Sequence, residues 1–568
     1  MQIAWTFHTG PHHLPVHDFT HPSIQCTPVI AEGVMYLTSA DTKVFALDSA
    51  TGRERWRFDP HRTKLSFLSN RGVAYWSDGV VSGERRILFA TPEGKLFSLD
   101  ARTGRPDTSF GSQGEIDLRE GVEGVLAELI YGATSAPVVY RNLVIIGFTL
   151  NEGFTSAPGD IRAFDVRTGR EVWRFHTVPR PGEFGHETWE DASWQSRGGA
   201  NAWGGLRADV ARGIVYAGLG SAAHDFYGGD RKGDNLFANC VIALDANTGR
   251  RLWHYQVVHH DLWDYDVPSP PALVHVRRGG RRVDAAVQAT KTGFIFLFDR
   301  VTGEPLFPVV ERPVPASDVP GERASPTQPV PVKPAPFVRQ GFTEADITDV
   351  SAESHAFIRE KIKKMRYGAP FLPPSLAGTI QMPGLHGGAT WSGVSFDPDT
   401  GWLYINANDM PWGVYLDAGK PRQGLHVGRG IGIFKDQFGF PASKPPWGKL
   451  VAVDLNRGEI KWQVPLGNWP GAERRGLKNS GTENFGGGIV TAGGLVFIAS
   501  TMDEKFRAFD KANGKLLWEY QLPAGGYAAP ATYSVGGRQY VVIAAGGGGK
   551  PRTKPGDAYI AFALPPRN

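Results

Sequence analysis

Short apolar segments that end in aspartate recur along the chain. In the first copy, Ala46-Leu47-Asp48 is followed by Thr51 and Gly52, and a second segment then carries Trp56. Aspartate accepts backbone hydrogen bonds within such a turn, and glycine supplies the positive φ that the turn needs. Seven copies occur, with their aspartates at Asp48, Asp100, Asp165, Asp245, Asp299, Asp454 and Asp510. The pattern therefore predicts seven β-hairpins, and the tryptophan that the second strand often carries is expected to fill the space between neighbouring sheets.

A further β-rich segment precedes each hairpin, as residues 33–37 do in the first copy, so each unit holds about four strands, as propeller blades do. An eighth unit, at residues 540–545 and 559–564, lacks a tryptophan-bearing strand. Residues 2–7, at the other end of the chain, carry Trp5 and match the ends of the earlier hairpins. We therefore predict an all-β, eight-bladed β-propeller with four-stranded antiparallel blades, whose ring is closed by pairing of the N- and C-terminal strands.

The repeat runs through the whole chain, so residues 1–568 are predicted to form a single propeller domain. Proline-rich residues 308–336 and 372–374 break the spacing of the repeat, and a short helix is predicted between them at residues 353–364. These features predict a surface insert at about residues 308–375. Elsewhere the 71 glycines and 42 prolines favour turns over long helices.

Charge and cysteine content exclude several classes of protein. The net charge is only +4, and the one dense basic group, residues 277–282, surrounds a Gly-Gly pair typical of a hairpin tip, so no nucleic-acid partner is expected. The two cysteines, Cys26 and Cys240, make neither a disulfide framework nor a thiolate cluster, and the sequence has no haem-attachment motif. No apolar stretch approaches the ~20 residues that span a bilayer, and no signal-peptide core follows Met1, so no transmembrane segment is expected.

The connections between strands divide the loops between two faces of the predicted ring. If the strands of a blade are counted outward from the axis, the turns after the third strand all lie on one face, and the other connections lie on the opposite face. The opposite face carries nearly every side chain that could act in catalysis or ligand binding: Arg71, Thr134, Glu152, Trp203, Ser221, Asp264, Lys291 and Asn484. Because the central funnel of a propeller is a natural ligand site, we expect the function on this face.

Each of these residues also has an ordinary structural interpretation. Asp264 alone could cap a turn, Lys291 could be a solvated surface lysine, and Trp203 could be core packing. Their presence together on one face favours a functional site. The neighbouring His259 and His260 suit hydrogen bonds that orient the loop better than they suit metal ligation.

Five specific motifs lie in the loops of this face. They are Asn-Arg-Gly-Val-Ala-Tyr at residues 70–75, Thr-Ser-Ala-Pro at 134–137, Gly-Ala-Asn-Ala-Trp-Gly at 199–204, His-His-Asp-Leu-Trp-Asp at 259–264 and Lys-Thr-Gly at 291–293. Through them the chain resembles the quinoprotein alcohol and glucose dehydrogenases over almost its whole length. Residues 315–328 and 491–498 look closer to the membrane glucose dehydrogenase branch, although the membrane-anchoring segment of that branch is absent here.

The resemblance implies two cofactors, pyrroloquinoline quinone (PQQ) and Ca²⁺, and a role for each matching residue. Asp264 would be the catalytic base, Lys291 would lie beside the quinone carbonyls, and Trp203 would stack under the cofactor. The other implied cofactor contacts are Gln25, Arg71, Thr134, Thr149, Thr390, Trp391 and Asn484. Calcium would be held by Asp264, Glu152 and Ser221, the last standing where the family often has asparagine. The chemistry agrees, because calcium takes oxygen ligands, and the quinone's carboxylates need cations and hydroxyls.

The implied activity is oxidation of a hydroxyl group of a sugar or polyol to a carbonyl or lactone. Electrons would pass to ubiquinone or cytochrome c, since the sequence has no nicotinamide fingerprint, and a periplasmic location is expected after removal of a signal peptide. Two alternatives stay open: a dehydrogenase of a simple or bulky secondary alcohol, and a non-catalytic propeller that serves as a scaffold or assembly factor. The sequence leaves the substrate undecided, because the pocket rim is expected in loops at residues 365–376 and 408–424.

Overall fold

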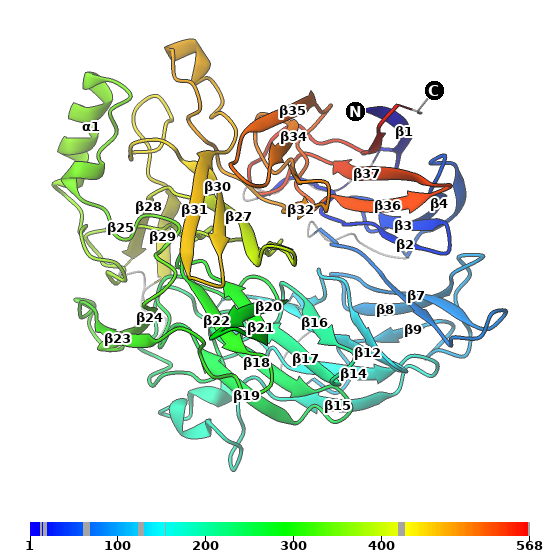
Figure 1. Cartoon of the computed structure of the whole chain (residues 1–568). Coiled ribbons are helices and arrows are strands. Elements are labelled where there is room, and N and C mark those ends of the chain that lie inside the picture. Colours follow the sequence, from blue (N-terminus) through cyan, green and yellow to red (C-terminus); the bar gives the residue numbers. More distant parts are fainter. Residues whose placement is uncertain are drawn as a thin grey trace.

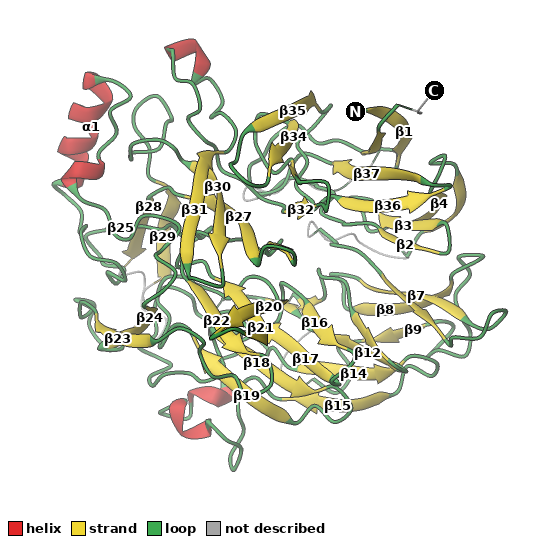
Figure 2. Cartoon of the chain, in the orientation of Figure 1, coloured by secondary structure: helices red, strands yellow, loops and turns green. Residues whose placement is uncertain are grey.

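The computed structural model describes residues 1–11, 14, 20–60, 69–122, 130–153, 155–417 and 427–565. Strands dominate these residues, and the few helices lie at the periphery (Figure 2). The sheets follow one another around the molecule in chain order, from blue through green to red, and the two chain ends lie near each other (Figure 1). The chain is therefore an all-β propeller, as predicted from the repeat.

The first half of the chain forms four sheets of four antiparallel strands each. Their strands are β2 (Val29–Ala31), β3 (Val34–Thr38), β4 (Val44–Asp48), β5 (Glu54–Phe58); β6 (Ala74–Ser77), β7 (Arg85–Ala90), β8 (Lys95–Asp100), β9 (Glu115–Asp117); β11 (Val138–Tyr140), β12 (Leu143–Ile146), β14 (Ile161–Asp165), β15 (Glu171–Phe175); and β16 (Leu206–Asp209), β17 (Ile214–Gly218), β18 (Cys240–Asp245), β19 (Arg251–Gln256). A separate two-stranded sheet pairs β10 (Tyr131–Gly132), which precedes β11, with β13 (Thr149–Leu150), which lies between β12 and β14 in the chain.

The second half continues the series. Its sheets contain β20 (Ala272–Arg278), β21 (Arg281–Ala289), β22 (Ile295–Asp299); β26 (Ser395–Asp397), β27 (Trp402–Asn408), β30 (Gly448–Asp454), β31 (Glu459–Pro465); β32 (Gly488–Val490), β33 (Leu495–Ile498), β34 (Lys505–Asp510), β35 (Leu516–Gln521); and β36 (Ala531–Val535), β37 (Arg538–Ala545), β38 (Ala558–Ala563), β1 (Gln2–His8). In the last sheet β1 pairs antiparallel with β38, from Gln2 opposite Ala563 to His8 opposite Ala558. The predicted pairing of the two terminal strands is confirmed.

One sheet departs from the predicted four strands. The sheet of β20, β21 and β22 has three, and the chain after Asp299 makes only an isolated bridge between Phe298 and Pro305. Pro305 and Pro308 lack the N–H that a ladder needs, which explains why no fourth strand forms.

The repeated turns have the chemistry that the sequence predicts. Asp48 Oδ1 accepts hydrogen bonds from the backbone N–H groups of Ala50 (3.2 Å) and Thr51 (3.1 Å) and from Thr51 Oγ1 (2.9 Å). Gly52 closes the turn with a φ of 73°, in the left-handed region. The same arrangement recurs at Asp100, Asp165 and Asp245.

Five tryptophans each join their own sheet to the aspartate turn of a neighbouring sheet. Trp56 Nε1 donates to the carbonyl of Ala101 at 3.0 Å, and a Cβ placed on Gly104 would lie 2.5 Å from the Trp56 ring. Glycine is therefore the residue that lets the indole lie flat on the next turn. The same ring-on-glycine contact pairs Trp5 with Gly52, Trp173 with Gly249, Trp253 with Gly303 and Trp462 with Gly514. The prediction that tryptophan fills the space between sheets is confirmed.

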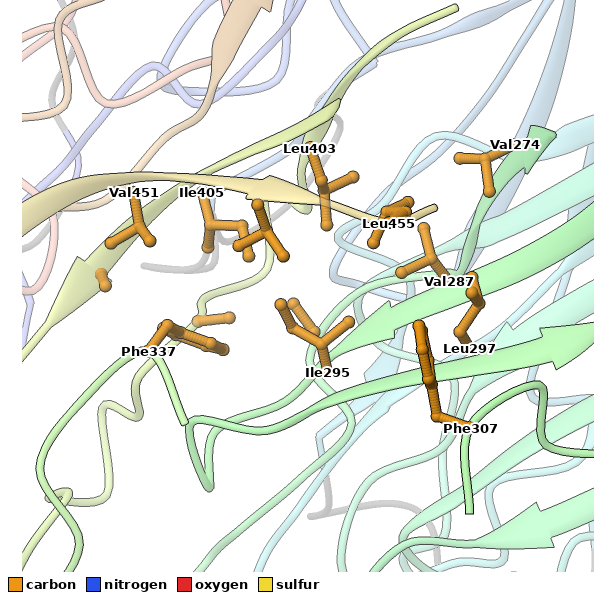
Figure 3. Packing of buried hydrophobic residues seen from close by; sticks show 14 of the residues in the cluster. Val274, Val287, Ile295, Leu297, Phe307, Phe337, Leu403, Ile405, Val451 and Leu455 are labelled. Atoms are coloured by element: carbon orange, nitrogen blue, oxygen red, sulfur yellow. The ribbon is translucent and has the colours of Figure 1, made fainter. Parts of the chain in front are cut away.

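Apolar side chains between adjacent sheets form the core (Figure 3). In one cluster, Val287 and Leu297 of the β20–β22 sheet pack with Leu403 and Val451 of the following sheet, and all four are at most 3% exposed. Burying one such side chain contributes about 1.5–3 kcal/mol, so the repeated clusters can hold the fold without a ligand.

The predicted insert contains a hairpin and the helix. β23 (Val309–Pro313) pairs with β24 (Thr327–Pro331), and α1 (Ala352–Ile362) overlaps the predicted helical segment, residues 353–364, and begins one residue before it. Ser351 caps α1 by accepting from Ser354 N at 3.0 Å. Short 3₁₀ turns are η1 (His186–Thr188), η2 (Ser193–Gln195), η3 (Glu344–Asp346) and η4 (Glu473–Arg475). The division into one domain with an insert stays a prediction.

A second excursion leaves the propeller between β27 and β30, where the sequence predicted a rim loop at residues 408–424 but no strands. It carries β28 (Trp412–Asp417) and β29 (Val427–Ile433), which extend a sheet begun by β25 (Thr379–Gln381). In the part of the chain that the structure describes, no helix is both long and apolar enough to cross a membrane.

Candidate active site

The predicted site residues lie in the loops expected from the topology. Ser221 follows β17 and Lys291 follows β21, both between the second and third strands of a sheet. Trp203 precedes β16 and Asp264 precedes β20, at the entry to a new sheet. These two kinds of connection lie on the same face, opposite the aspartate turns.

Lys291 is the centre of the site. Its Nζ lies 2.8 Å from Asp264 Oδ1, 2.8 Å from the carbonyl oxygen of Asp264 and 2.9 Å from Asp266 Oδ2. Asp266 in turn accepts from Ser221 N at 2.6 Å and from Trp203 Nε1 at 3.2 Å. One ammonium group therefore bridges two carboxylates, and one of those carboxylates holds the indole and the neighbouring loop.

The loop before Asp264 is built to hold that residue in an unusual backbone conformation. Asp264 has a φ of 56°, in the left-handed region that non-glycine residues rarely adopt. Asp261 anchors the loop by accepting from Trp263 N at 3.0 Å and Tyr265 N at 2.8 Å. His260 adds Nδ1···Gly233 O at 2.7 Å and Nε2···Glu322 Oε1 at 2.9 Å, so the predicted loop-orienting role of this histidine is confirmed.

His259 is also hydrogen-bonded, through Nδ1 to Gln256 Oε1 at 2.9 Å and through Nε2 to Glu311 Oε1 at 3.2 Å. Trp263 reaches the expected pocket rim, because its Nε1 donates to the carbonyl of Leu372 at 2.9 Å. The other expected rim loop is described as far as residue 417, and residues 418–424 lie outside the described residues.

Charge at the site is unbalanced toward the negative. Burial, together with Asp266 and Glu152, raises the pKa of the Asp264 carboxyl well above its ordinary value, although Lys291 opposes this. Burial also raises the pKa of Asp266, but Lys291 outweighs it, and the net pKa is lowered. Burial lowers the pKa of Lys291, and the two aspartates more than reverse this, so the net pKa is raised. Lys291 therefore stays protonated. Its charge does not offset the burial of Asp264 and the repulsion from Asp266 and Glu152.

Two further carboxyl groups, Glu152 and Asp225, add to the negative charge of the site. Burial and the charge of Asp266 raise the pKa of Glu152, and burial with Glu152, Asp264 and Asp266 raises the pKa of Asp225 well above its ordinary value. Within the described residues, no group of three or more histidine, cysteine or acidic side chains is already arranged as a metal-ligand set. The donor chemistry nevertheless fits a hard cation, because oxygen ligands that raise one another's pKa gain from a nearby positive ion.

Ser221, a predicted metal ligand, makes internal bonds. Its Oγ donates to Asp261 Oδ2, and Asn239 Nδ2 lies 3.3 Å from the same hydroxyl. The hydroxyl proton therefore points to Asp261, and an oxygen lone pair would have to serve a metal. The metal role of Ser221 stays a prediction.

Five of the predicted cofactor residues lie in one connected group. The Arg71 guanidinium lies 4.7 Å from the ring centre of Trp391 and 5.4 Å from that of Trp203. Arg71 Nη1 donates to Thr134 Oγ1 at 2.7 Å, and Thr134 Oγ1 lies 2.7 Å from Thr149 Oγ1. Burial lowers the pKa of Arg71 to about 9. A cation, two hydroxyls and two indole faces suit a flat, negatively charged ring system.

The other three predicted cofactor contacts differ from one another. Gln25 Oε1 is buried without a hydrogen-bond partner in the described structure, so it is free to accept from a ligand. Thr390 Oγ1 lies 3.3 Å from Ser392 Oγ. Asn484 is already occupied: its Oδ1 accepts from Asn406 at 2.7 Å, and its Nδ2 donates to two backbone carbonyls at 3.0 and 3.1 Å. Its amide ties strands together, and its cofactor contact stays an untested prediction.

The sequence interpretation did not include Asp266 or Asp225. Asp266 lies only two positions after Asp264, but the spacing alone does not show that both carboxylates meet Lys291. Asp225 lies four positions after Ser221 and likewise gave no signal alone.

The fold and the site together match a known family. Residues 1–541 match the PQQ family model, the β-propeller domain of glucose, ethanol and alcohol dehydrogenases. The chain therefore belongs to the PQQ-dependent dehydrogenases, which are oxidoreductases of alcohol or sugar donors. A non-catalytic scaffold is accordingly not the class of this protein.

Curated relatives and a solved structure agree. The chain is 33% identical over 622 aligned residues to quinoprotein glucose dehydrogenase A of Acinetobacter calcoaceticus, which covers 100% of this chain and 76% of that protein. It is 34% identical over 610 residues to the glycerol dehydrogenase large subunit of Gluconobacter oxydans, with 100% and 82% covered. The structure of a quinohemoprotein alcohol dehydrogenase from Pseudomonas putida HK5 superposes with a TM-score of 0.71 at 26% identity, covering 99% of this chain and 76% of that chain.

Proposed function

We propose that the chain oxidises a hydroxyl group of a sugar or polyol to a carbonyl or lactone, with PQQ and Ca²⁺, and passes the electrons to ubiquinone or cytochrome c in the periplasm. We also propose that the propeller is a closed ring of eight blades. The support for the ring is the series of seven four-stranded sheets and the three-stranded β20–β22 sheet among the described residues, together with the pairing of β1 and β38.

The observation that carries the proposal is the bridge from Lys291 Nζ to Asp264 and Asp266 beside the Trp203 indole. In the proposed complex, Trp203 supplies a flat face for the quinone, and Arg71 with the threonine hydroxyls binds its carboxylates. Glu152, Asp264 and Ser221 would hold calcium. When bound, the quinone supplies a two-electron acceptor and calcium supplies Lewis acidity at its carbonyl.

The residues of this chain supply the proton chemistry. The Asp264 carboxylate is the proposed acceptor of the substrate's hydroxyl proton. Lys291 contacts Oδ1 and the backbone carbonyl of Asp264, so Oδ2 is the carboxylate oxygen outside the lysine contact. Because Lys291 alone does not offset the burial of Asp264 and the charges of Asp266 and Glu152, a further cation at the site would bring the raised pKa of Asp264 back toward the range in which it is an ionised base.

The polyol assignment is supported by the relatives named for glucose and glycerol, each more than 30% identical over the whole chain. The alternative, a simple or bulky secondary alcohol, is supported by quinohemoprotein alcohol dehydrogenase ADH IIB of Pseudomonas putida, 30% identical with 93% of this chain covered, and by the alcohol dehydrogenase structure at 26% identity. The relatives named for glucose and glycerol have the somewhat higher identity and coverage, which favours the polyol.

A substrate panel tests the proposal. Purified protein is loaded with PQQ and calcium, and reduction of an artificial electron-accepting dye is measured with glucose, glycerol, other polyols, ethanol and secondary alcohols. Higher kcat/KM for polyols is expected. Turnover of monohydric alcohols alone would transfer the assignment to the alternative, and turnover with a nicotinamide cofactor in place of PQQ would refute the proposed chemistry.

A further inference from the structure

A buried histidine–glutamate pair lies at the edge of the site and has no part in the chemistry described so far. His386 Nδ1 lies 2.5 Å from Glu483 Oε1, and Glu483 is only 4% exposed. The His386 ring packs edge-to-face on Trp412, at 4.4 Å between ring centres, and on Phe485 at 5.2 Å. The carboxylate and the two aromatic rings fix both the position and the rotation of the imidazole.

The loop that carries His386 rests on Lys291. A Cβ placed on the next residue, Gly387, would lie 2.4–2.7 Å from Cγ, Cβ and Cα of Lys291. Gly388 N donates to the Lys291 carbonyl at 2.7 Å, and Asn408 N donates to the Gly388 carbonyl at 3.0 Å. His386 is therefore held one residue from a backbone segment in direct contact with the centre of the site.

The imidazole has an unused acceptor. Burial lowers the pKa of His386, and Lys550 and Lys291 also lower it while Glu483 opposes them, so the ring is neutral near pH 7. With its proton on Nδ1, facing the Glu483 carboxylate, the ring carries a lone pair on Nε2. None of the hydrogen bonds found among the described residues uses Nε2 of His386.

The other buried histidine–glutamate pair near the site, His260 with Glu322, uses both of its ring nitrogens. His260 bonds Glu322 through Nε2 and the Gly233 carbonyl through Nδ1, so both of its nitrogens serve the fold. His386 uses one nitrogen for the fold and keeps the other. A rigid, neutral acceptor on the loop that contacts Lys291 is suited to accepting a hydrogen bond from a hydroxyl group.

We propose that His386 Nε2 accepts a hydrogen bond from a second hydroxyl group of the substrate, adjacent to the one that is oxidised, and that it thereby selects polyhydroxy substrates over monohydric alcohols. Glu483 is a positioning residue, which fixes the Nδ1–H tautomer. The inference rests on the proposed function, since it names the residue that would make this site prefer a polyol.

Two substitutions distinguish the roles of the two imidazole nitrogens of His386. Asparagine places an amide near the position of Nδ1, so His386→Asn keeps a donor for Glu483 and removes the acceptor at Nε2. Glutamine reaches the position of Nε2, so His386→Gln can restore an acceptor there. His176→Asn is the matched control, because His176 pairs with Glu183 at 2.8 Å in a more exposed pair and is not one of the residues placed in the site.

The measurement is kcat and KM, at saturating PQQ and calcium, for the polyol that the wild type oxidises best and for its deoxy analogue without the neighbouring hydroxyl. His386→Asn is expected to lower kcat/KM for the polyol by about five- to tenfold, mostly through KM, because one neutral hydrogen bond is lost. The deoxy analogue should change less than twofold, and His386→Gln should recover part of the loss. Thermal melting and quinone titration check that the variants are folded and loaded.

Equal losses for the polyol and its deoxy analogue would overturn the inference, as would an unchanged polyol kcat/KM in a folded, loaded His386→Asn protein. Failure of the proposed function looks different, because it shows in the wild type as absence of PQQ-dependent polyol turnover before any variant is compared.

Discussion

Replacing Asp264 with asparagine should abolish most of the turnover without weakening the fold. The substitution keeps the side-chain size and removes the proposed base, and a general base typically contributes ~10²–10⁴-fold in rate, or about 3–5 kcal/mol of activation free energy. Lys291 keeps its contacts with Asp266 at 2.9 Å and with the backbone carbonyl of residue 264 at 2.8 Å, so the buried ammonium is not left unpaired. The expected loss of turnover is therefore two to four orders of magnitude, in a protein that still packs around Lys291.

The thermal stability of the same variant gives a second, independent test. Folding raises the pKa of the Asp264 carboxyl, so its contribution to stability is present below its ordinary pKa and is lost as the pH rises through the raised value. At pH 7, which is above the ordinary pKa of an aspartate, a buried carboxyl whose pKa is raised by folding therefore lowers the stability of the calcium-free protein. Asparagine carries no charge, so the metal-free Asp264→Asn protein should keep the wild-type Tm at pH 7 or exceed it.

The assay is dye-linked turnover at rising calcium and PQQ, with bound quinone counted by absorbance, because weak metal binding alone could imitate a catalytic defect. Asp191→Asn is the control, since Asp191 pairs with Lys232 at 2.9 Å on the surface and should leave turnover unchanged. Near-normal turnover of Asp264→Asn at full occupancy would refute the assignment of Asp264 as the base. A large fall in Tm would refute the electrostatic reasoning.

Four further outcomes are expected. Protein made without PQQ should be folded but inactive, because the apolar clusters carry the fold, and adding PQQ with calcium should restore dye reduction; a molten apo-protein in melting and circular dichroism experiments would contradict this. Trp203→Ala should weaken quinone binding by about fivefold, since a stacking face is worth on the order of 1 kcal/mol, and an unchanged affinity in a quinone titration would restore the core-packing interpretation. Gly249→Ala, whose Cβ would lie 2.5 Å from the Trp173 ring, should lower the free energy of unfolding by roughly 1–3 kcal/mol, more than Gly279→Ala, which has a positive φ but open space; equal losses in denaturant titrations would argue against the indole contact. Calcium should raise the Tm more at pH 8 than at pH 5, because the raised pKa values of the site carboxylates leave them partly protonated in acid; equal shifts at the two pH values would exclude these groups as ligands.

The sequence by itself determined the repeating parts of this protein. The aspartate and the tryptophan of each hairpin lie within about ten positions of one another, and the hydrogen bonds of the turn are local, so the hairpin from Asp48 to Trp56 could be predicted from spacing alone. Alternation of antiparallel strands then assigned each loop to a face, which is why Trp203, Asp264 and Lys291 were expected together before any distance was known.

The tertiary structure decided which of those side chains meet. The bridge from Lys291 to Asp266, the engagement of the Asn484 amide by Asn406, and the pairing of His386 with Glu483 join loops that are 25, 78 and 97 positions apart. Such contacts depend on how neighbouring sheets pack against one another, and no local pattern encodes that. The same reason explains why the Asn484 amide, whose contact with a cofactor stays a prediction, bonds Asn406 and the backbone carbonyls of Ala407 and Thr482: a buried amide bonds the partners that packing brings to it.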